Sequence, residues 1–273
     1  MGTQYESKIL NVALSKFKIH YIPDIVYSQV PTLESPNKLL QMDLLVPQIN
    51  KLMPAVIFVT GGGFISANRA RMPQLRMKLA ESGYVVASIN YRTVPNATFP
   101  QPIEDVKTAI RYLKANAKKF NIDPKQIAVI GDSAGGYLTA FAAVTNGSTT
   151  FNVGDNLDQS SEIVAAVDLY GIVDISAVSD FPQMFQSLNG IPLEKTNPIN
   201  YITKNSAPML LMHGTADNIV SPKQTDLLFQ ALRSAGVEAE RYLIPNANHA
   251  DDYWLQDEVL KLIIEFLNGH VIK

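Results

Sequence analysis

Short, continuous apolar runs alternate with stretches of helical periodicity over most of this chain, and that alternation limits the folds it can adopt. Apolar runs of this kind are typical of strands buried on both faces, and helices between them favour parallel strands. The sequence therefore predicts an α/β fold, with a mostly parallel sheet of about eight strands and helices on both faces. The expected buried strands are Ala55–Thr60, Tyr84–Tyr91, Gln126–Ile130, Val164–Tyr170, Met209–His213 and Glu240–Ile244. The expected helices are Met72–Ser82, Pro102–Phe120, Gly135–Thr145, Lys223–Ala235 and Asp251–Leu267.

The length of 273 residues predicts a single domain over residues 1–273, because single-sheet α/β folds routinely exceed about 200 residues. Prolines interrupt residues 15–50, and alternation there predicts antiparallel strands, most clearly at Leu39–Val46. The N-terminal segment 1–38 and a small insert at 175–207 are candidate cap elements. Such inserts often shape access to a site, although plain surface decoration fits the pattern equally well.

Composition excludes several classes of function. The net charge is −2 and no basic tract is interleaved with aromatic residues, so nucleic acid is not an expected partner. The absence of cysteine excludes disulfides, thiolate nucleophiles and cysteine-containing zinc sites. The chain has neither a leader-like N-terminus nor an apolar stretch of about 18 residues, which predicts a cytoplasmic protein without membrane contact. The sequence leaves homo-oligomerisation open.

The strongest local signal is the apolar strand Ile127–Ile130, which runs into Gly131-Asp-Ser133-Ala-Gly135 and then into a helix-forming stretch. A strand, a G-x-S-x-G turn and a helix form the context of a nucleophile elbow, whose glycines let neighbouring backbone pass closely. Ser133 is therefore the candidate nucleophile. An ordinary strand-to-helix turn is the competing interpretation, but the residues expected of a serine hydrolase follow in the order nucleophile, acid, histidine.

The chain has four histidines, His20, His213, His249 and His270, so the search for a general base is short. His249 lies in a turn-rich loop between the last predicted strand and the last helix, where a triad histidine is expected. His20 precedes the serine, His213 closes a buried strand in a position typical of a packed residue, and His270 follows the last helix. His249 is the predicted base.

Three aspartates compete for the role of the acid that orients the histidine. Asp217 follows the strand Met209–His213 at the carboxyl edge of the predicted sheet. Asp174 follows the preceding strand and is the second choice, while Asp168 lies inside a strand and is expected to be structural. Because the strand before Asp217 neighbours the strand that leads to His249, Asp217 is the predicted acid.

An oxyanion hole needs backbone N–H groups aimed at the developing charge, and the glycine-rich loop Thr60–Phe64 can supply them. The Ala134 amide, at the start of a helix, adds a donor supported by the helix dipole. A phosphate-binding loop is the alternative, but the spacing of such loops is absent and no lysine follows the glycines.

With these motifs in place, residues 39 to 267 resemble the hormone-sensitive-lipase-like branch of the α/β-hydrolases, especially small bacterial carboxylesterases grouped with feruloyl esterases. The segments that carry the resemblance are Gly131–Gly136, Asn90–Pro95, Phe99-Pro100, Asp123-Pro124, Tyr170–Asp174 and His213–Asp217. The resemblance implies that the oxyanion donors are the amides of Gly62, Gly63 and Ala134. One departure is Thr60, because the family usually has histidine directly before the three glycines.

The resemblance and the residues together predict a serine carboxylesterase that hydrolyses short-chain acyl or small aromatic esters, with hydroxycinnamoyl esters among them. The alternatives are a non-catalytic binding protein on the same fold, or a serine peptidase or amidase. We expect a small-molecule ester as the partner, and no metal or organic cofactor, because a triad activates its own nucleophile. The residues predicted to bind substrate are Phe64, Tyr91, Tyr170, Val173 and Ile219.

Overall fold

A computed structural model describes residues 7–177 and 190–271 of the chain. Eight strands of these residues form one sheet in the order β1-β2-β4-β3-β5-β6-β7-β8. β1 pairs with β2 and β2 with β4 in antiparallel fashion, and every other neighbouring pair is parallel. The strands are β1 Ile19–Val30, β2 Lys38–Pro47, β3 Met53–Val59, β4 Val85–Ile89, β5 Ile122–Asp132, β6 Ala166–Leu169, β7 Met209–Gly214 and β8 Ala239–Ile244.

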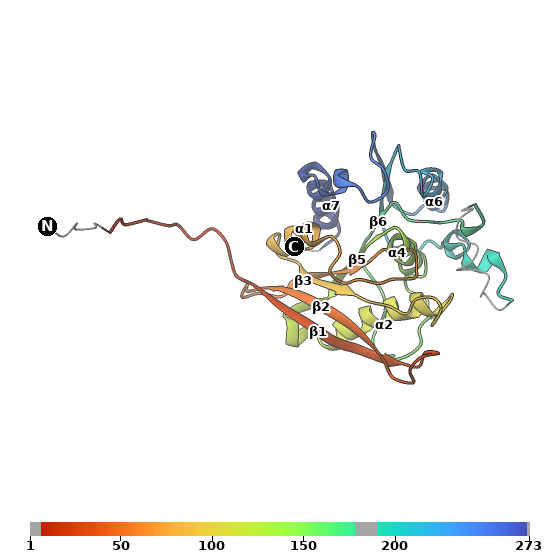
Figure 1. Ribbon diagram of the computed structural model, residues 1–273, viewed down its shortest axis with the longest axis horizontal. Helices are drawn as coiled ribbons and strands as arrows, with labels where there is room; N and C mark the ends of the chain where they lie inside the picture. The colour runs from red at the N-terminus through yellow and green to blue at the C-terminus, as the bar shows by residue number, and fades with distance from the viewer. Residues whose placement is uncertain (1–6, 178–189, 272–273) are drawn as a thin grey trace.

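Helices cover both faces of the sheet, as the alternating pattern predicts. The α-helices are α1 Pro73–Glu81, α2 Gln101–Ala115, α3 Ala117–Phe120, α4 Ala134–Val144, α6 Lys223–Ser234 and α7 Asp257–His270. Short 3₁₀ helices are η1 Ile175–Ala177, η2 Leu193–Thr196, η3 Pro198–Tyr201 and η4 Asp252–Leu255. Helices α1 and α7 lie on one side of the sheet, and α2, α4 and α6 on the other (Figure 1). The predicted mostly parallel, two-sided α/β architecture is confirmed.

Two hydrophobic clusters hold these layers together, one on each face of the sheet. Alternate residues of one strand join opposite clusters: Ile57 packs toward α2 and α4, whereas Phe58 packs toward α1 and α7. This alternation follows from the two-residue repeat of a β-strand. All five residues of β4 are buried, which explains why the central strands read as continuous apolar runs.

The strand register brings the carboxyl ends of the parallel strands to a common edge. Val59 of β3 pairs with Gly131 of β5, and Asp132 pairs with Leu169 of β6. The loops that follow these strands therefore start side by side. At the next pair, Gly214 at the end of β7 aligns with Ile244 at the end of β8. Chain segments far apart in sequence are thus delivered to one place above the sheet.

Four predicted elements need correction. The helix expected at 102–120 is divided at Asn116, and the helix expected from residue 251 starts as η4, with α7 beginning only at Asp257. The prediction of a buried strand at 240–244 is wrong, because β8 is an edge strand in which only Ala239 is buried. Residues 19–30, part of the segment proposed as a cap, form the edge strand β1 instead.

The insert predicted at 175–207 is partly described. Residues 175–177 and 190–207 carry η1, η2 and η3, and the remaining positions lie outside the described residues. The Tyr137 hydroxyl, from the first turns of α4, donates a hydrogen bond of 2.7 Å to the carbonyl of Thr196 in η2. This part of the insert is therefore attached to the helix that follows Ser133.

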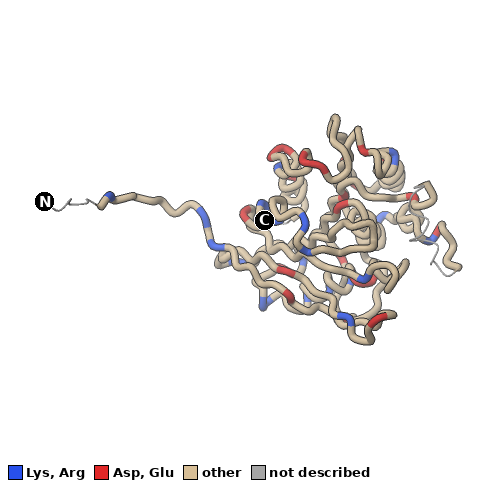
Figure 2. Tube along the Cα trace, in the orientation of Figure 1, with Lys and Arg blue, Asp and Glu red and all other residues tan. Residues whose placement is uncertain are grey.

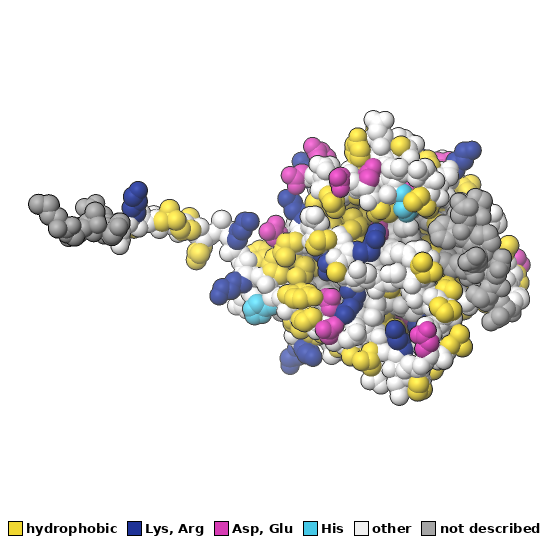
Figure 3. Space-filling view, viewed as in Figure 1, with side chains coloured by type: hydrophobic (Ala, Val, Ile, Leu, Met, Phe, Trp, Pro, Cys, Tyr) yellow, Lys and Arg dark blue, Asp and Glu magenta, His cyan; other side chains and the backbone are white. Residues whose placement is uncertain are grey.

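Residues 7–18 extend away from the folded part of the molecule (Figure 1). Figure 3 shows hydrophobic side chains along this segment, and Ile9, Leu10, Val12 and Leu14 are 73–97% exposed. Over the described residues, basic and acidic side chains are interspersed along the trace (Figure 2). No helix within these residues is both long enough and apolar enough to cross a membrane.

Candidate active site

Ser133 occupies a sharp turn between β5 and α4. Its φ of 53° and ψ of −115° lie outside the common regions for a residue with a side chain, which is the strained geometry of a nucleophile elbow. Its amide donates to the carbonyl of Leu169, 2.9 Å away, which ties the turn to β6. A Cβ on Gly135 would collide with the carbonyl oxygen of Val59, so only glycine fits this close crossing.

Ser133, His249 and Asp217 form a continuous chain of hydrogen bonds. The distance from His249 Nε2 to Ser133 Oγ is 2.9 Å, and from His249 Nδ1 to Asp217 Oδ2 it is 2.8 Å. Ser133 and Asp217 are buried, each 8% exposed. The structure thus brings together the three residues that the sequence predicts as nucleophile, base and acid, across separations of 116 and 32 residues.

Asp217 is held as a carboxylate by several donors. Burial alone would raise its pKa, but hydrogen bonds from His213, from His249 and from the Val220 amide hold the pKa well below its ordinary value. The amide of Ile219 also donates to the same carboxylate at 3.0 Å. The acid is therefore ionised and fixed in orientation before any substrate binds.

His213 is an unexpected neighbour of this carboxylate. Its Nε2 lies 2.9 Å from the carbonyl oxygen of Val220 and 3.3 Å from Asp217 Oδ2, and the side chain is fully buried. The sequence predicts His213 as a packed, hydrogen-bonded residue, which it is. Its contact with Asp217 was not predicted, although the four-residue spacing on one turn was a signal for it.

The two other candidate acids lie elsewhere. Asp174 Oδ1 accepts hydrogen bonds from the amide and hydroxyl of Ser176, at 3.0 and 2.6 Å, so it caps the turn of η1. Asp168 is fully buried within β6, and its Oδ1 accepts from the Gly171 amide at 2.8 Å. Neither of these carboxylates has a hydrogen bond to His249 in the described part of the chain.

The loop between β8 and η4 places His249 over the serine. Asn248 Oδ1 accepts hydrogen bonds from the amides of His249 and Asn218, and Asp251 Oδ2 accepts from the Asn248 amide. The ring of Tyr170 packs edge-on against the imidazole at 4.8 Å between centroids, and Trp254 packs on Tyr170 at 4.4 Å. These contacts fix the imidazole on the α7 side of the sheet.

The glycine loop after β3 faces the elbow. Gly62 and Gly63 have φ values of 141° and 59°, a conformation that suits glycine, so their bare backbone can lie close to a reacting group. Within residues 7–177 and 190–271, their amides donate to no protein acceptor. The Ala134 amide opens helix α4, where no earlier helical carbonyl can accept it. All three remain available to an external oxygen.

Two contacts anchor this loop where the resembled family has a histidine. Asp132 Oδ1 accepts from the Gly61 amide at 2.7 Å, and Tyr91 donates its hydroxyl to the carbonyl of Thr60 at 2.8 Å. Arg71 pairs with the other oxygen of Asp132 at 2.9 Å, which offsets the buried charge. Asp132, the residue between Gly131 and Ser133, thus connects the elbow directly to the glycine loop.

The five residues predicted to bind substrate have different locations. Phe64 lines a pocket beside the glycine loop. Tyr91 and Tyr170 are 3% and 1% exposed, so they support the loop and the imidazole from behind, which corrects the expectation that they line the pocket. Val173 is fully buried, with its amide bonded to Gln224, whereas Ile219 is 55% exposed beside Asp217.

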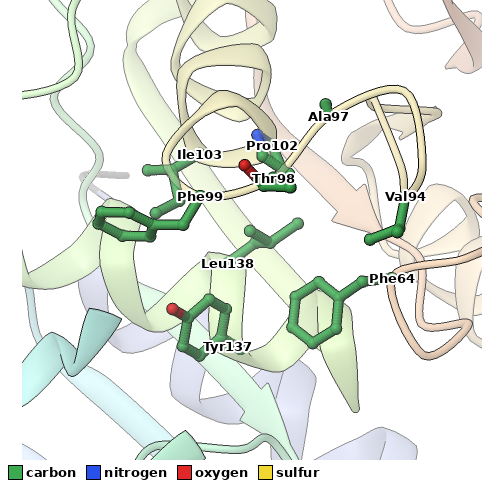
Figure 4. Close-up of a pocket in the computed structure, with 9 residues that line it drawn as sticks. All are labelled: Phe64, Val94, Ala97, Thr98, Phe99, Pro102, Ile103, Tyr137 and Leu138. Carbon is green, nitrogen blue, oxygen red and sulfur yellow. The ribbon is translucent and has the colours of Figure 1, made fainter. Parts of the chain in front are cut away.

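The pocket lies on the α2 side of Ser133. Its empty volume is about 350 Å³, including the part open to solvent. Figure 4 shows Phe64 and Val94 facing Leu138 and Tyr137 from α4, with Thr98 and Pro102 along another side. The lining residues are Phe64, Val94, Ala97, Thr98, Phe99, Pro102, Ile103, Tyr137 and Leu138. Asn90–Pro95 and Phe99-Pro100 carry the family resemblance, but the sequence did not predict that Val94 and Phe99 line a pocket.

In the part of the chain that the structure describes, no group of three or more histidine, aspartate or glutamate side chains is arranged to hold a metal ion. The side chains around Ser133 are instead connected to one another by the hydrogen bonds given above. The arrangement can supply an activated hydroxyl, a proton acceptor and free amide donors.

Comparison with known proteins agrees with this geometry. The chain is 31% identical to esterase LipC of Mycobacterium tuberculosis over 74% of its own length and 54% of that protein. It is 27% identical to isoprenylcysteine alpha-carbonyl methylesterase ICME of Arabidopsis thaliana, over 91% of this chain and 61% of the relative. The chain thus spans only about half to three fifths of the length of these relatives.

A solved structure is also similar to this chain over most of its length. A truncated carbohydrate esterase from gut microbiota superposes with a TM-score of 0.81 and 28% identity, covering 94% of this chain and 98% of the other. The BD-FAE family profile matches residues 42–232, which include Ser133 and Asp217, while His249 lies beyond the match. With its two-sided parallel sheet and these matches, the chain belongs to the BD-FAE family of α/β-hydrolase esterases.

Proposed function

We propose that this protein is a serine carboxylesterase in which Ser133 is the nucleophile, His249 the general base and Asp217 the acid that orients the histidine. The observation that carries the proposal is the hydrogen-bond chain of 2.9 and 2.8 Å from Ser133 through His249 to Asp217, beside a loop with free amides. Its relatives named as esterases support the same activity.

In the first half of the reaction, Ser133 Oγ attacks the ester carbonyl carbon while His249 Nε2 takes the hydroxyl proton. The carbonyl oxygen becomes an oxyanion, to which the amides of Gly62, Gly63 and Ala134 donate. Donors that are already fixed need no rearrangement as the charge forms, which lowers the barrier. His249 then gives the proton to the departing alcohol oxygen, and the acyl group stays bonded to Ser133.

In the second half, water replaces the alcohol. His249 removes one proton from the water, the resulting hydroxide adds to the acyl carbon, and a second oxyanion forms. Its collapse breaks the bond to Ser133, the proton returns from His249 to the serine, and a carboxylic acid leaves. Asp217 stays ionised throughout and stabilises the imidazolium that forms twice in the cycle.

The substrate class that we propose is short-chain acyl esters and small aromatic esters, with hydroxycinnamoyl esters among the latter. Apolar side chains line most of the pocket beside the glycine loop, which favours burial of a small apolar acyl group. Because one structural relative is described as a carbohydrate esterase, acylated sugars are candidate natural substrates. A cytoplasmic location, and a small-molecule ester as the substrate, are proposals that rest on the sequence, which leaves homo-oligomerisation open.

The test compares wild type with Ser133→Ala, using p-nitrophenyl acetate, a matched acetanilide and a fluorophosphonate probe. We expect wild type to hydrolyse the ester faster than the amide and to be labelled at Ser133. The variant should keep its melting temperature but lose about three or more orders of magnitude in kcat. Unlabelled, inactive wild type would indicate a binding protein, and faster hydrolysis of the amide would indicate an amidase.

A further inference from the structure

Phe99 lines two separate spaces, a pocket and a groove. It lines the pocket next to the glycine loop and also a wider outer groove, whose empty volume is about 850 Å³ including open solvent. The other residues of the outer groove are Pro100, Phe151, Gly190, Ile191, Pro192, Lys195 and Tyr201. In Figure 4, Phe64 and Val94 stand at one end of the pocket, and Phe99 and Ile103 stand toward the other. Phe99 is therefore a wall between the two spaces.

The reaction geometry determines which half of an ester enters the pocket, provided that the proposed function holds. The departing alcohol must lie beside His249, because this residue protonates it. His249 is fixed by Tyr170 and Trp254, which belong to the hydrophobic cluster on the α1 and α7 face. The pocket is built from the opposite cluster, on the α2 and α4 face. The acyl half therefore points away from His249 into the pocket.

The ring of Phe99 is held in place by neighbouring aromatic side chains. Its centroid lies 5.6 Å from that of Phe141 and 5.6 Å from that of Phe151, within the range of favourable aromatic pairs. Tyr201 packs on these two partners at 5.4 and 5.5 Å without an aromatic contact to Phe99 itself. A ring supported on one side by such a cluster is a firm end to an acyl pocket.

We propose that Phe99 sets the upper limit on acyl-chain length. With the ring present, the pocket accepts acetyl and butyryl groups, and a longer chain meets the ring before it reaches the outer groove. Removal of the ring joins the two spaces, so that a chain can continue past Leu138 toward the apolar side chains of Ile191 and Tyr201. The outer groove then becomes the site for the distal carbons of the acyl group.

The experiment measures kcat/KM for p-nitrophenyl acetate, butyrate and octanoate with wild type, Phe99→Ala and Phe99→Leu. We expect the octanoate to acetate ratio to rise about tenfold or more in Phe99→Ala, since each well-accommodated methylene contributes strongly to discrimination. Phe99→Leu should show a smaller rise, and it decides the question if the alanine variant fails to fold. Tyr201→Ala tests the alternative that the outer groove sets the limit, and its ratio should rise less than that of Phe99→Ala. Leu157→Ala is the control, because this exposed side chain lines neither space.

The outcomes separate this inference from the proposed function. If wild type hydrolyses acetate while both Phe99 variants keep its octanoate to acetate ratio, the inference is overturned and the esterase assignment stands. An equal rise in Tyr201→Ala would also overturn it, since the limit would then lie in the outer groove. If wild type hydrolyses no ester and is not labelled by the fluorophosphonate, both the proposed function and the inference about Phe99 are wrong.

Discussion

At the scale of single residues, Asp217 has two histidine neighbours, His249 at 2.8 Å and His213 at 3.3 Å. The first contact holds the tautomer of His249 in which Nε2 can accept the serine proton. An asparagine at 217 would keep the shape but lose the charge that stabilises imidazolium. We expect Asp217→Asn to lower kcat by about 10³ to 10⁴, as an equivalent change does in other serine hydrolases.

The matched control is Asp174→Asn, because Asp174 hydrogen-bonds to Ser176 and lies on the neighbouring loop. Its kcat should remain close to that of wild type. Steady-state kinetics with p-nitrophenyl acetate at one pH will compare the variants. A large loss in Asp174→Asn together with near-normal turnover in Asp217→Asn would show that the acid has been assigned to the wrong residue.

Sequence reasoning could select Ser133, Asp217 and His249 as candidates because each follows a recognisable strand, and the strand register brings those strand ends together. It could not identify the contacts that depend on packing between loops. The hydrogen bond from the Gly61 amide to Asp132, and the ion pair of Arg71 with the same carboxylate, join segments that show no shared pattern. The sequence likewise did not predict that the segment from Val94 to Ile103 lines a pocket, because this depends on how the segment packs against α4.

At the scale of elements, β6 carries a carboxyl group in the interior of the sheet. Burial raises the pKa of Asp168 to about 7, although the hydrogen bond from the Gly171 amide opposes the shift. In the unfolded chain, the same group has a pKa of about 3.9. Between these values the unfolded state is ionised while the folded state keeps its proton. The contribution of Asp168 to the free energy of unfolding therefore falls as pH rises from about 4 to 7 and levels off above that.

Asp168→Asn removes this titration while keeping an oxygen for the Gly171 amide. We expect the variant to gain stability relative to wild type as pH rises, by up to about 1.4 kcal/mol for each unit of pKa difference. Urea unfolding at pH 5 and pH 8 measures the effect for both proteins. Parallel stability curves for wild type and variant would contradict a buried, protonated Asp168.

The sequence predicted best the helices and strands that the apolar pattern alone is enough to specify. Central strands and the amphipathic helix α6 are specified by apolar patterns alone. The break at Asn116 and the late start of α7 coincide with local hydrogen bonds, from the Asn116 side chain to the Tyr112 carbonyl and from the Tyr253 amide to Asp251, which periodicity does not record. β8 resembled a buried strand because Tyr242–Ile244 form a continuous apolar run, yet its place at the sheet edge leaves Tyr242 and Leu243 exposed.

At the scale of the whole molecule, the segment before β1 contributes little to the folded body. Residues 7–14 are exposed, and the first ion pair of the segment joins Lys16 to Glu81 between largely exposed side chains. Surface pairs of this kind contribute at most about 1 kcal/mol. We expect a variant that lacks residues 1–14 to keep the melting temperature and the esterase rate of the full chain.

Differential scanning fluorimetry and the p-nitrophenyl acetate assay check this prediction. The shortened protein should also aggregate less, because its most exposed apolar side chains have been removed. A fall of several degrees in melting temperature would show that the N-terminal segment contributes to stability. If the shortened protein aggregates as fast as the full chain, the apolar side chains of residues 7–14 do not drive aggregation.

The anchoring of the glycine loop limits which side chains position 60 can carry. Thr60 is fully buried, and its carbonyl receives the Tyr91 hydroxyl, while Asp132 secures the next residue of the loop. A histidine at position 60 needs more room than a packed interior provides, and overpacking of this kind costs about 1–3 kcal/mol. Exchange of threonine for histidine at position 60 therefore requires changes in the side chains packed around it, those near Tyr91 among them.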